Sequence, residues 1–104
     1  MKAIGFTVAA LVMLVTVQPV VAGDAAAGES IYAAKGCIAC HGPGGNSANP
    51  AMFPKTAGLE EAYLAEQMTA FRDGARSNPM MSPMAVGLSD EDIANLAAYL
   101  SEQK

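Results

Sequence analysis

Both cysteines of this 104-residue chain lie in one pentapeptide, Cys37-Ile38-Ala39-Cys40-His41, and His41 is its only histidine. The C-x-x-C-H spacing is typical of a segment whose two thiols add to the vinyl groups of a haem while the adjacent imidazole ligates the iron. We therefore expect one haem c per chain, attached covalently through Cys37 and Cys40, with His41 as an axial ligand.

Three other uses of the two thiols explain the pattern less well. A disulfide between Cys37 and Cys40 closes a very short loop, adds little stability and leaves His41 without a role. A thioredoxin-like redox pair has the same C-x-x-C spacing but belongs to a βαβ context, which this chain does not indicate. A zinc site needs about four ligands, and two cysteines with one histidine are too few.

A second axial ligand has to come from another residue type, and methionine is the obvious candidate. Met80, Met81 and Met84 lie in a proline-bracketed segment about forty residues beyond His41. A thioether from this segment could reach the opposite face of the ring. At most one of the three binds the iron, and the residue types alone leave the choice open.

The elements that must position these groups are helical. Asp24 is a predicted N-cap for a helix that runs from Ala25 to about Lys35 and ends at Gly36, directly before the cysteine motif. Residues 42–58 are rich in Gly, Pro, Asn and Ala without apolar periodicity, so we expect a long loop around the cofactor.

Two further helices follow this loop. Apolar spacing predicts a helix over residues 59–72 that ends at Gly74, and then a second loop over residues 75–87. Ser89 and Asp92 form a predicted capping box at the start of the last helix. No strand-like alternation is visible, so the expected fold is all-α, with three main helices and long loops around one covalently bound haem.

Residues 1–22 have the pattern of a signal peptide. Lys2 is followed by an apolar run of about 14 residues, which Pro19 interrupts before it reaches the ~20 residues of a membrane span. We expect cleavage after Ala22 and a periplasmic domain of residues 23–104; the less favoured alternative is an uncleaved membrane anchor. Covalent haem attachment of this kind takes place after export, which agrees with the motif.

The remaining domain is small and acidic. Residues 23–104 contain five basic and ten acidic side chains, a net charge of −5. This charge disfavours nucleic acid and anionic membranes as partners and favours a protein that presents a basic patch. We expect a soluble mature chain without a membrane span, and a core that needs the cofactor to be complete.

These features together resemble the class I c-type cytochromes, particularly the short bacterial periplasmic ones and the single domains of two-haem cytochromes. The resemblance covers most of residues 23–104. It rests on Gly28 with Tyr32, the Cys37 to His41 motif, Gly44-Gly45-Asn46, Phe53-Pro54-Lys55, the Met-rich segment and Leu88-Ser89-Asp90. It implies a cytochrome c fold in which the first helix crosses the last, with Gly28 and Tyr32 near Leu96 and Tyr99.

The resemblance also implies roles around the iron. The Pro54 carbonyl is expected to accept a hydrogen bond from Nδ1 of His41, because such partners orient axial ligands. In members with a similar Met-Met run, the ligand stands seven residues before the leucine that precedes the last helix. Counting back in this chain gives Met81, with Met84 as the alternative. The chain departs from the family pattern at Thr56, where an apolar residue is usual.

The function that follows is electron transfer without catalysis. Iron ligated by His41 and a methionine is expected to cycle between its ferric and ferrous states, passing single electrons between periplasmic or membrane redox proteins. Two alternatives remain: a haem-based gas-binding or sensor module with an open sixth position, and a haem-free thiol-redox enzyme.

Overall fold

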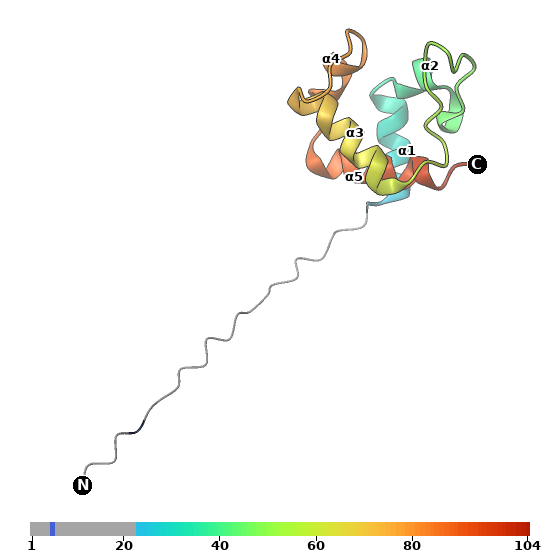
Figure 1. Ribbon diagram of the computed structural model, residues 1–104. Helices are drawn as coiled ribbons and strands as arrows, with labels where there is room; N and C mark the ends of the chain where they lie inside the picture. Colours follow the sequence, from blue (N-terminus) through green and yellow to red (C-terminus); the bar gives the residue numbers. More distant parts are fainter. Residues whose placement is uncertain (1–4, 6–22) are drawn as a thin grey trace.

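The computed structural model describes Gly5 and residues 23–104, and residues 23–104 form a small helical domain (Figure 1). Its elements in chain order are α1 (Ala25–Ala34), α2 (Cys37–His41), the 3₁₀ helix η1 (Pro43–Gly45), α3 (Glu61–Asp73), α4 (Met81–Ala85) and α5 (Asp90–Ser101). These residues contain no strand, and none of their helices has the length and apolarity needed to cross a membrane. The all-α prediction is confirmed. The predicted signal peptide of residues 1–22 and its cleavage after Ala22 lie, apart from Gly5, outside the described residues.

Helix α1 begins and ends at the residues that the sequence indicated. The Asp24 carboxylate accepts hydrogen bonds from the backbone amides of Ala26 and Ala27, at 2.9 and 3.3 Å. Gly36 takes the left-handed conformation with φ of 77°, which glycine adopts without steric cost. The chain then turns directly into α2, so the left-handed residue places the cysteine motif immediately after α1.

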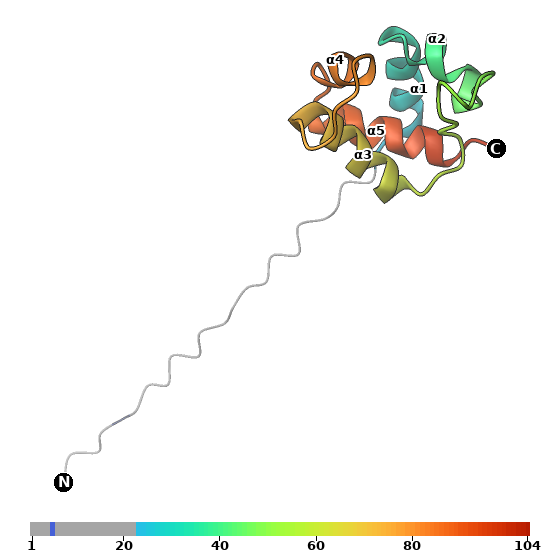
Figure 2. The same ribbon diagram turned by 45° about the horizontal axis from the view of Figure 1, so that its top comes forward.

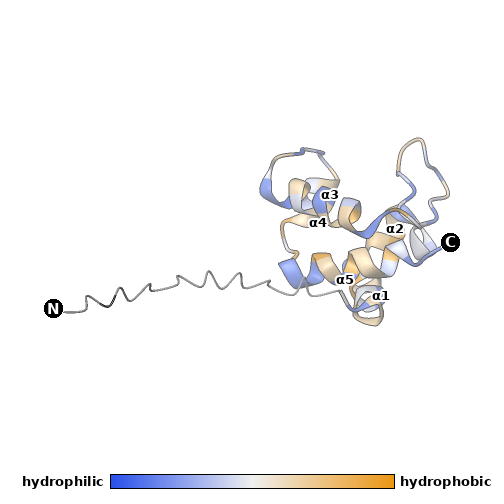
Figure 3. Cartoon of the chain, turned by 60° about the horizontal axis from the view of Figure 1, so that its bottom comes forward, coloured by the Kyte–Doolittle hydropathy of each residue, from blue (hydrophilic) through white to orange (hydrophobic). Residues whose placement is uncertain are grey.

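Helix α5 has more buried residues than any other helix in residues 23–104, and it carries the predicted capping box. Ser89 Oγ accepts from the Asp92 amide and the Asp92 carboxylate accepts from the Ser89 amide, both at 3.0 Å. Figure 3 shows hydrophilic residues at the first turn of α5 and mostly hydrophobic residues after it. Its inward face includes Ile93, Leu96 and Leu100, so α5 forms the floor of the core.

Helices α1 and α5 cross at very short range, as the family resemblance implied. A Cβ atom added at Gly28 would lie 2.0 Å from the Asn95 carbonyl oxygen, so only glycine fits there. One turn later the rings of Tyr32 and Tyr99 pack at a centroid distance of 5.5 Å. The Asn95 side chain adds a polar link, because its Oδ1 accepts from the Asp24 amide at 2.8 Å.

The second half of the chain differs from the prediction in two places. The helix expected over residues 59–72 begins two residues later, at Glu61, and ends at Gly74, which has φ of 87°. The segment expected to be a loop over residues 75–87 contains the short helix α4. A five-residue helix has no stability of its own, and α4 depends on its packing against α3.

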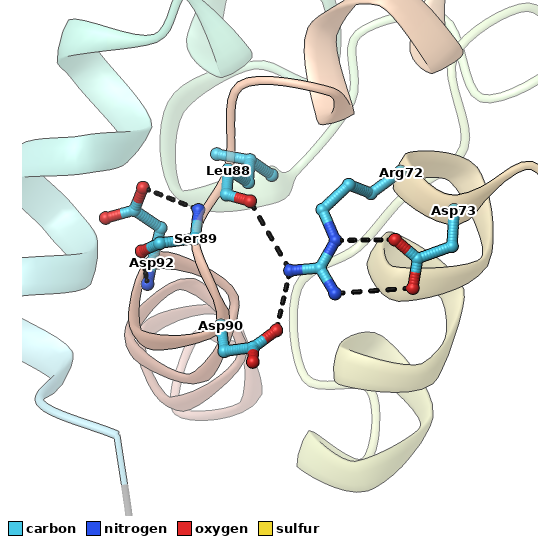
Figure 4. Close-up of polar contacts among 6 residues, drawn as sticks. All are labelled: Arg72, Asp73, Leu88, Ser89, Asp90 and Asp92. Atoms are coloured by element: carbon cyan, nitrogen blue, oxygen red, sulfur yellow. Dashed lines mark hydrogen bonds and ion pairs between the residues drawn. The ribbon is translucent and has the colours of Figure 1, made fainter.

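Figures 1 and 2 show how these elements surround the centre of the domain. Helices α1 and α2 lie on one side, α3 and α4 on the other, and α5 runs across beneath both. An ion-pair network ties α3 to the start of α5 (Figure 4): the Arg72 guanidinium bonds Asp73 at 2.9 Å and Asp90 at 2.7 Å. The pKa of the Asp73 carboxyl is lowered by this hydrogen bond to Arg72. The Arg72–Asp90 pair thus links α3 to the first residue of α5.

Candidate functional site

A cavity of about 290 Å³ lies between the two groups of helices. Apolar side chains from α3, α5 and the segment before α5 form most of its wall, among them Leu64, Met68, Phe71, Leu88 and Leu96. The described residues that line it include no aspartate and no glutamate. The cavity therefore suits a largely apolar, ring-sized group.

Helix α2 brings both thiols to the cavity wall. Cys37 and Cys40 are free thiols in the described part of the chain, and both line the cavity. Burial raises the pKa of the Cys37 thiol. A low-pKa redox cysteine would show the opposite shift, so the surroundings of Cys37 do not favour the thiol-redox alternative.

His41 lies in the same wall, at the end of α2, and a hydrogen bond restrains the orientation of its ring. Its Nδ1 lies 2.8 Å from the Pro54 carbonyl oxygen, the hydrogen bond that the family resemblance predicted. A carbonyl can only accept, so Nδ1 carries a proton, and in the neutral imidazole Nε2 then has a free lone pair. A histidine in this state can ligate a metal through Nε2. The Tyr32 hydroxyl donates to the carbonyl of Gly42, which fixes the chain directly after His41.

The three methionines of the far segment line the same cavity from the opposite side. Met80 and Met84 are 53% and 45% exposed, whereas Met81 is half-buried and therefore less exposed than either. Asn78 fixes this segment, because its Oδ1 accepts from the backbone amides of Met80 and Met81 at 2.9 and 3.0 Å. In Figures 1 and 2, α4 and α2 lie on opposite sides of the domain centre.

The donor set and the cavity fit a covalently attached haem. Two thiols and an imidazole nitrogen are available at one wall, thioethers at the other, and apolar side chains between them. Within residues 23–104, no group of three or more His, Cys, Asp or Glu side chains is arranged so that it could hold a metal ion by itself.

Three contributors to this site were not predicted from the sequence. Asn78 caps the methionine segment, and Asn-Pro is a turn signal that could have indicated it. The hydroxyl of Tyr32 donates a hydrogen bond to the carbonyl of Gly42, the residue after His41, and no local sequence pattern predicts this contact. Thr56 was noted only as a departure from the family pattern, and it is one of the residues that line the cavity.

Fold and site together define a c-type haem protein that transfers electrons. The sequence profile of the cytochrome c family matches residues 25–104, and the chain belongs to this family. Its haem is therefore of the covalently attached c type.

Relatives of this chain include one of similar size and several longer ones. Over 86 residues it is 48% identical to cytochrome c-554(548) of Halomonas halodenitrificans, covering 80% of this chain and all of that protein. Over 71 residues it is 51% identical to a thiosulfate dehydrogenase electron acceptor of Thiomonas intermedia, covering 68% of this chain and 33% of that protein. The crystal structure of reduced cytochrome c4 from Pseudomonas stutzeri matches with a TM-score of 0.69 and 35% identity, covering 77% of this chain and 48% of that chain. The chain thus spans less than half of these two longer relatives.

Proposed function

We propose that this chain carries single electrons between redox proteins outside the cytoplasm, with haem bonded to Cys37 and Cys40 and its iron ligated by His41 and Met81. The observation that carries the proposal is that both thiols and the histidine share one cavity with the methionine segment of α4. When bound, the haem supplies an iron that takes up and releases one electron. The residues of the chain determine how readily it does so.

The hydrogen bond to Pro54 gives His41 a fixed role. The hydrogen bond from Nδ1 to the Pro54 carbonyl restrains rotation of the ring and leaves Nε2 as the nitrogen that would bind the iron. The same bond increases electron donation from the imidazole to the metal. A ligand that is held in one orientation needs little rearrangement when the charge of the metal changes.

Two features favour Met81 as the sixth ligand over Met80 and Met84. Met81 is the least exposed of the three methionines. Met81 also stands seven residues before Leu88 in the sequence, as the iron-binding methionine does in the family pattern. Thioether ligation stabilises the reduced metal and raises the reduction potential.

The apolar wall excludes water and raises the potential further. Leu64, Leu96 and their neighbours provide a low dielectric, which disfavours the additional positive charge of the oxidised iron. We assign no catalytic activity to the chain, because proteins of this family pass electrons to partner proteins and do not convert a substrate.

The partners are redox proteins that dock weakly and briefly. The relative from Thiomonas intermedia carries the name of an electron acceptor for thiosulfate dehydrogenase, which supports a partner of this general kind. With a net charge of −5 on residues 23–104, attraction at long range favours a partner surface with a basic patch. Residues 1–22 act as a signal peptide cleaved after Ala22, which leads to a mature soluble chain in the periplasm.

The ligand assignment is tested by replacing each methionine in turn. Met81→Ala is expected to remove the absorption band of thioether-ligated ferric haem, to lower the reduction potential and to let carbon monoxide bind rapidly to the reduced protein. Met84→Ala and Met80→Ala are the matched controls and should retain the wild-type spectrum. If Met84→Ala gives this result instead, the sixth ligand is Met84. If the wild-type reduced protein itself binds carbon monoxide rapidly, the sixth position is open and the gas-binding alternative holds.

A further inference from the structure

Arg76 presents a positive charge at the cavity wall without an acidic partner in residues 23–104. The ion pairs found in this part of the chain both belong to Arg72. Arg76 instead donates from Nη1 to Gln67 Oε1 at 2.7 Å, and its guanidinium lies 4.6 Å from the centre of the Phe71 ring. Gln67, Phe71 and Arg76 all line the cavity. The cation is therefore held beside the cavity by neutral groups, although the domain contains ten acidic side chains.

The contacts of Arg76 with α3 leave most of its donors free. A guanidinium over an aromatic ring is attracted to the face of the ring, which restrains its position. The bond to Gln67 uses only one N–H group, so other N–H groups of the planar fork remain available. Such a fork binds a carboxylate through two parallel hydrogen bonds. Arg76 is thus suited to an anionic carboxylate in the cavity.

The chemistry of the haem determines where its carboxylates lie. The two vinyl groups of a haem are on adjacent pyrrole rings, and its two carboxylates are on the other two. Bonds from Cys37 and Cys40 to the vinyl groups therefore place the carboxylates at the edge of the ring that points away from α2. Helices α3 and α4 lie across the centre of the domain from α2 (Figures 1 and 2). Arg76 follows α3 and packs on it, so it lies on that far side.

The other cations of the cavity wall are placed less well for this role. Besides the cysteines, the charged and titratable side chains of the wall are Lys35, Lys55, Arg76, His41, Tyr32 and Tyr63. Lys35 stands two residues before Cys37, beside the edge that carries the thioethers. Lys55 directly follows Pro54, the hydrogen-bond partner of His41, and so lies on the histidine side of the ring. Arg76 is therefore the cation that fits the carboxylate edge.

We infer that Arg76 is a haem-binding residue whose guanidinium pairs with a carboxylate of the haem, and that Gln67 and Phe71 position it. The inference rests on the haem site proposed above and adds a residue to it. The positive charge compensates a negative charge that would otherwise stabilise the oxidised iron. Arg76 thus raises the reduction potential.

The experiment compares three variants of the complete haem protein, each of which removes one positive charge from the cavity wall. Arg76→Gln tests the pair, and Lys35→Gln and Lys55→Gln are the matched controls. All three side chains are exposed, so these replacements leave the core unchanged. The haem carboxylates are labelled with carbon-13, and the pH titration of their NMR resonances is followed in the reduced protein.

In Arg76→Gln one haem carboxyl group is expected to titrate about 1 pH unit higher than in the wild type, because loss of the adjacent cation disfavours its ionised form. The two lysine variants should keep both titration midpoints close to the wild-type values. The reduction potential of Arg76→Gln, measured at a pH above both midpoints, should fall.

Unchanged midpoints in Arg76→Gln, an equal rise in all three variants, or a potential that does not fall in Arg76→Gln overturns the inference. In each case the protein still contains covalent haem, so the proposed function stands. A wild-type protein without haem would overturn the proposed function itself, and the two failures are therefore distinguishable.

Discussion

The contact between α1 and α5 at Gly28 makes a quantitative prediction about the frame that carries the cysteine motif. In Gly28→Ala the new Cβ would lie 2.0 Å from the Asn95 carbonyl oxygen and 2.8 Å from Tyr99 Cβ. Ordinary contacts begin at 3.4 Å, so the helices have to separate by roughly 1.4 Å. The obstacle is backbone on the facing helix, which cannot rotate away as a side chain could.

The expected loss of stability follows from two opposing effects. Overpacking in a core costs about 1–3 kcal/mol, and a clash with backbone belongs at the upper end of that range. Replacing glycine by alanine inside a helix contributes about 1 kcal/mol in the opposite direction. The net expectation is a loss of about 2 kcal/mol, which lowers the Tm of a domain of this size by about 10 °C.

Denaturant unfolding of the haem protein, followed by circular dichroism, measures this loss. Gly87→Ala is the matched control, since an added Cβ at Gly87 meets nothing within 4 Å and its φ is not positive. The control should stay within about 0.5 kcal/mol of the wild type. A free energy of unfolding for Gly28→Ala that is equally close to the wild type would show that α1 and α5 do not cross as described.

Three further predictions concern single contacts. Ser89→Ala removes the N-cap of α5 and should cost about 1 kcal/mol in denaturant unfolding; an unchanged midpoint would contradict the capping box with Asp92. Asn95→Ala leaves the Asp24 amide without its partner and should cost about 1–2 kcal/mol by the same assay, whereas no loss would mean that this link is not formed in solution. Burial raises the pKa of Tyr32 from 10.0 to about 12, so its stabilising effect is complete below pH 10 and is lost as the pH rises through about 12. Thermal unfolding of Tyr32→Phe should therefore depend less on pH over this interval, and an equally steep decline would contradict the assignment.

The parts of the fold that were predictable are those set by local chemistry. Asp24 and the Ser89 capping box satisfy backbone amides at helix starts, and Gly36 and Gly74 accept left-handed backbone at helix ends. Such effects depend on a few adjacent residues, and a sequence pattern can therefore identify them. The short helices α2 and α4 were missed for the opposite reason, because five residues form a helix only when the surrounding chain packs against them.

The candidate site divides in a similar way. The haem motif is contiguous, so its residue types and spacing indicate the cofactor directly. The hydrogen bond between Pro54 and His41 connects residues 13 positions apart, and only the family resemblance pointed to it. The position of Arg76 over the Phe71 ring depends on how the chain folds back onto α3 after Gly74, which no sequence pattern indicates.

Mass spectrometry of the exported polypeptide under denaturing conditions tests covalent haem attachment most directly. The expected result is a mature chain that begins at Gly23 and carries the mass of one haem. This added mass should remain after acid extraction and should be lost when both Cys37 and Cys40 are replaced by serine. A colourless polypeptide of unmodified mass, with both thiols free to react after reduction, would contradict it.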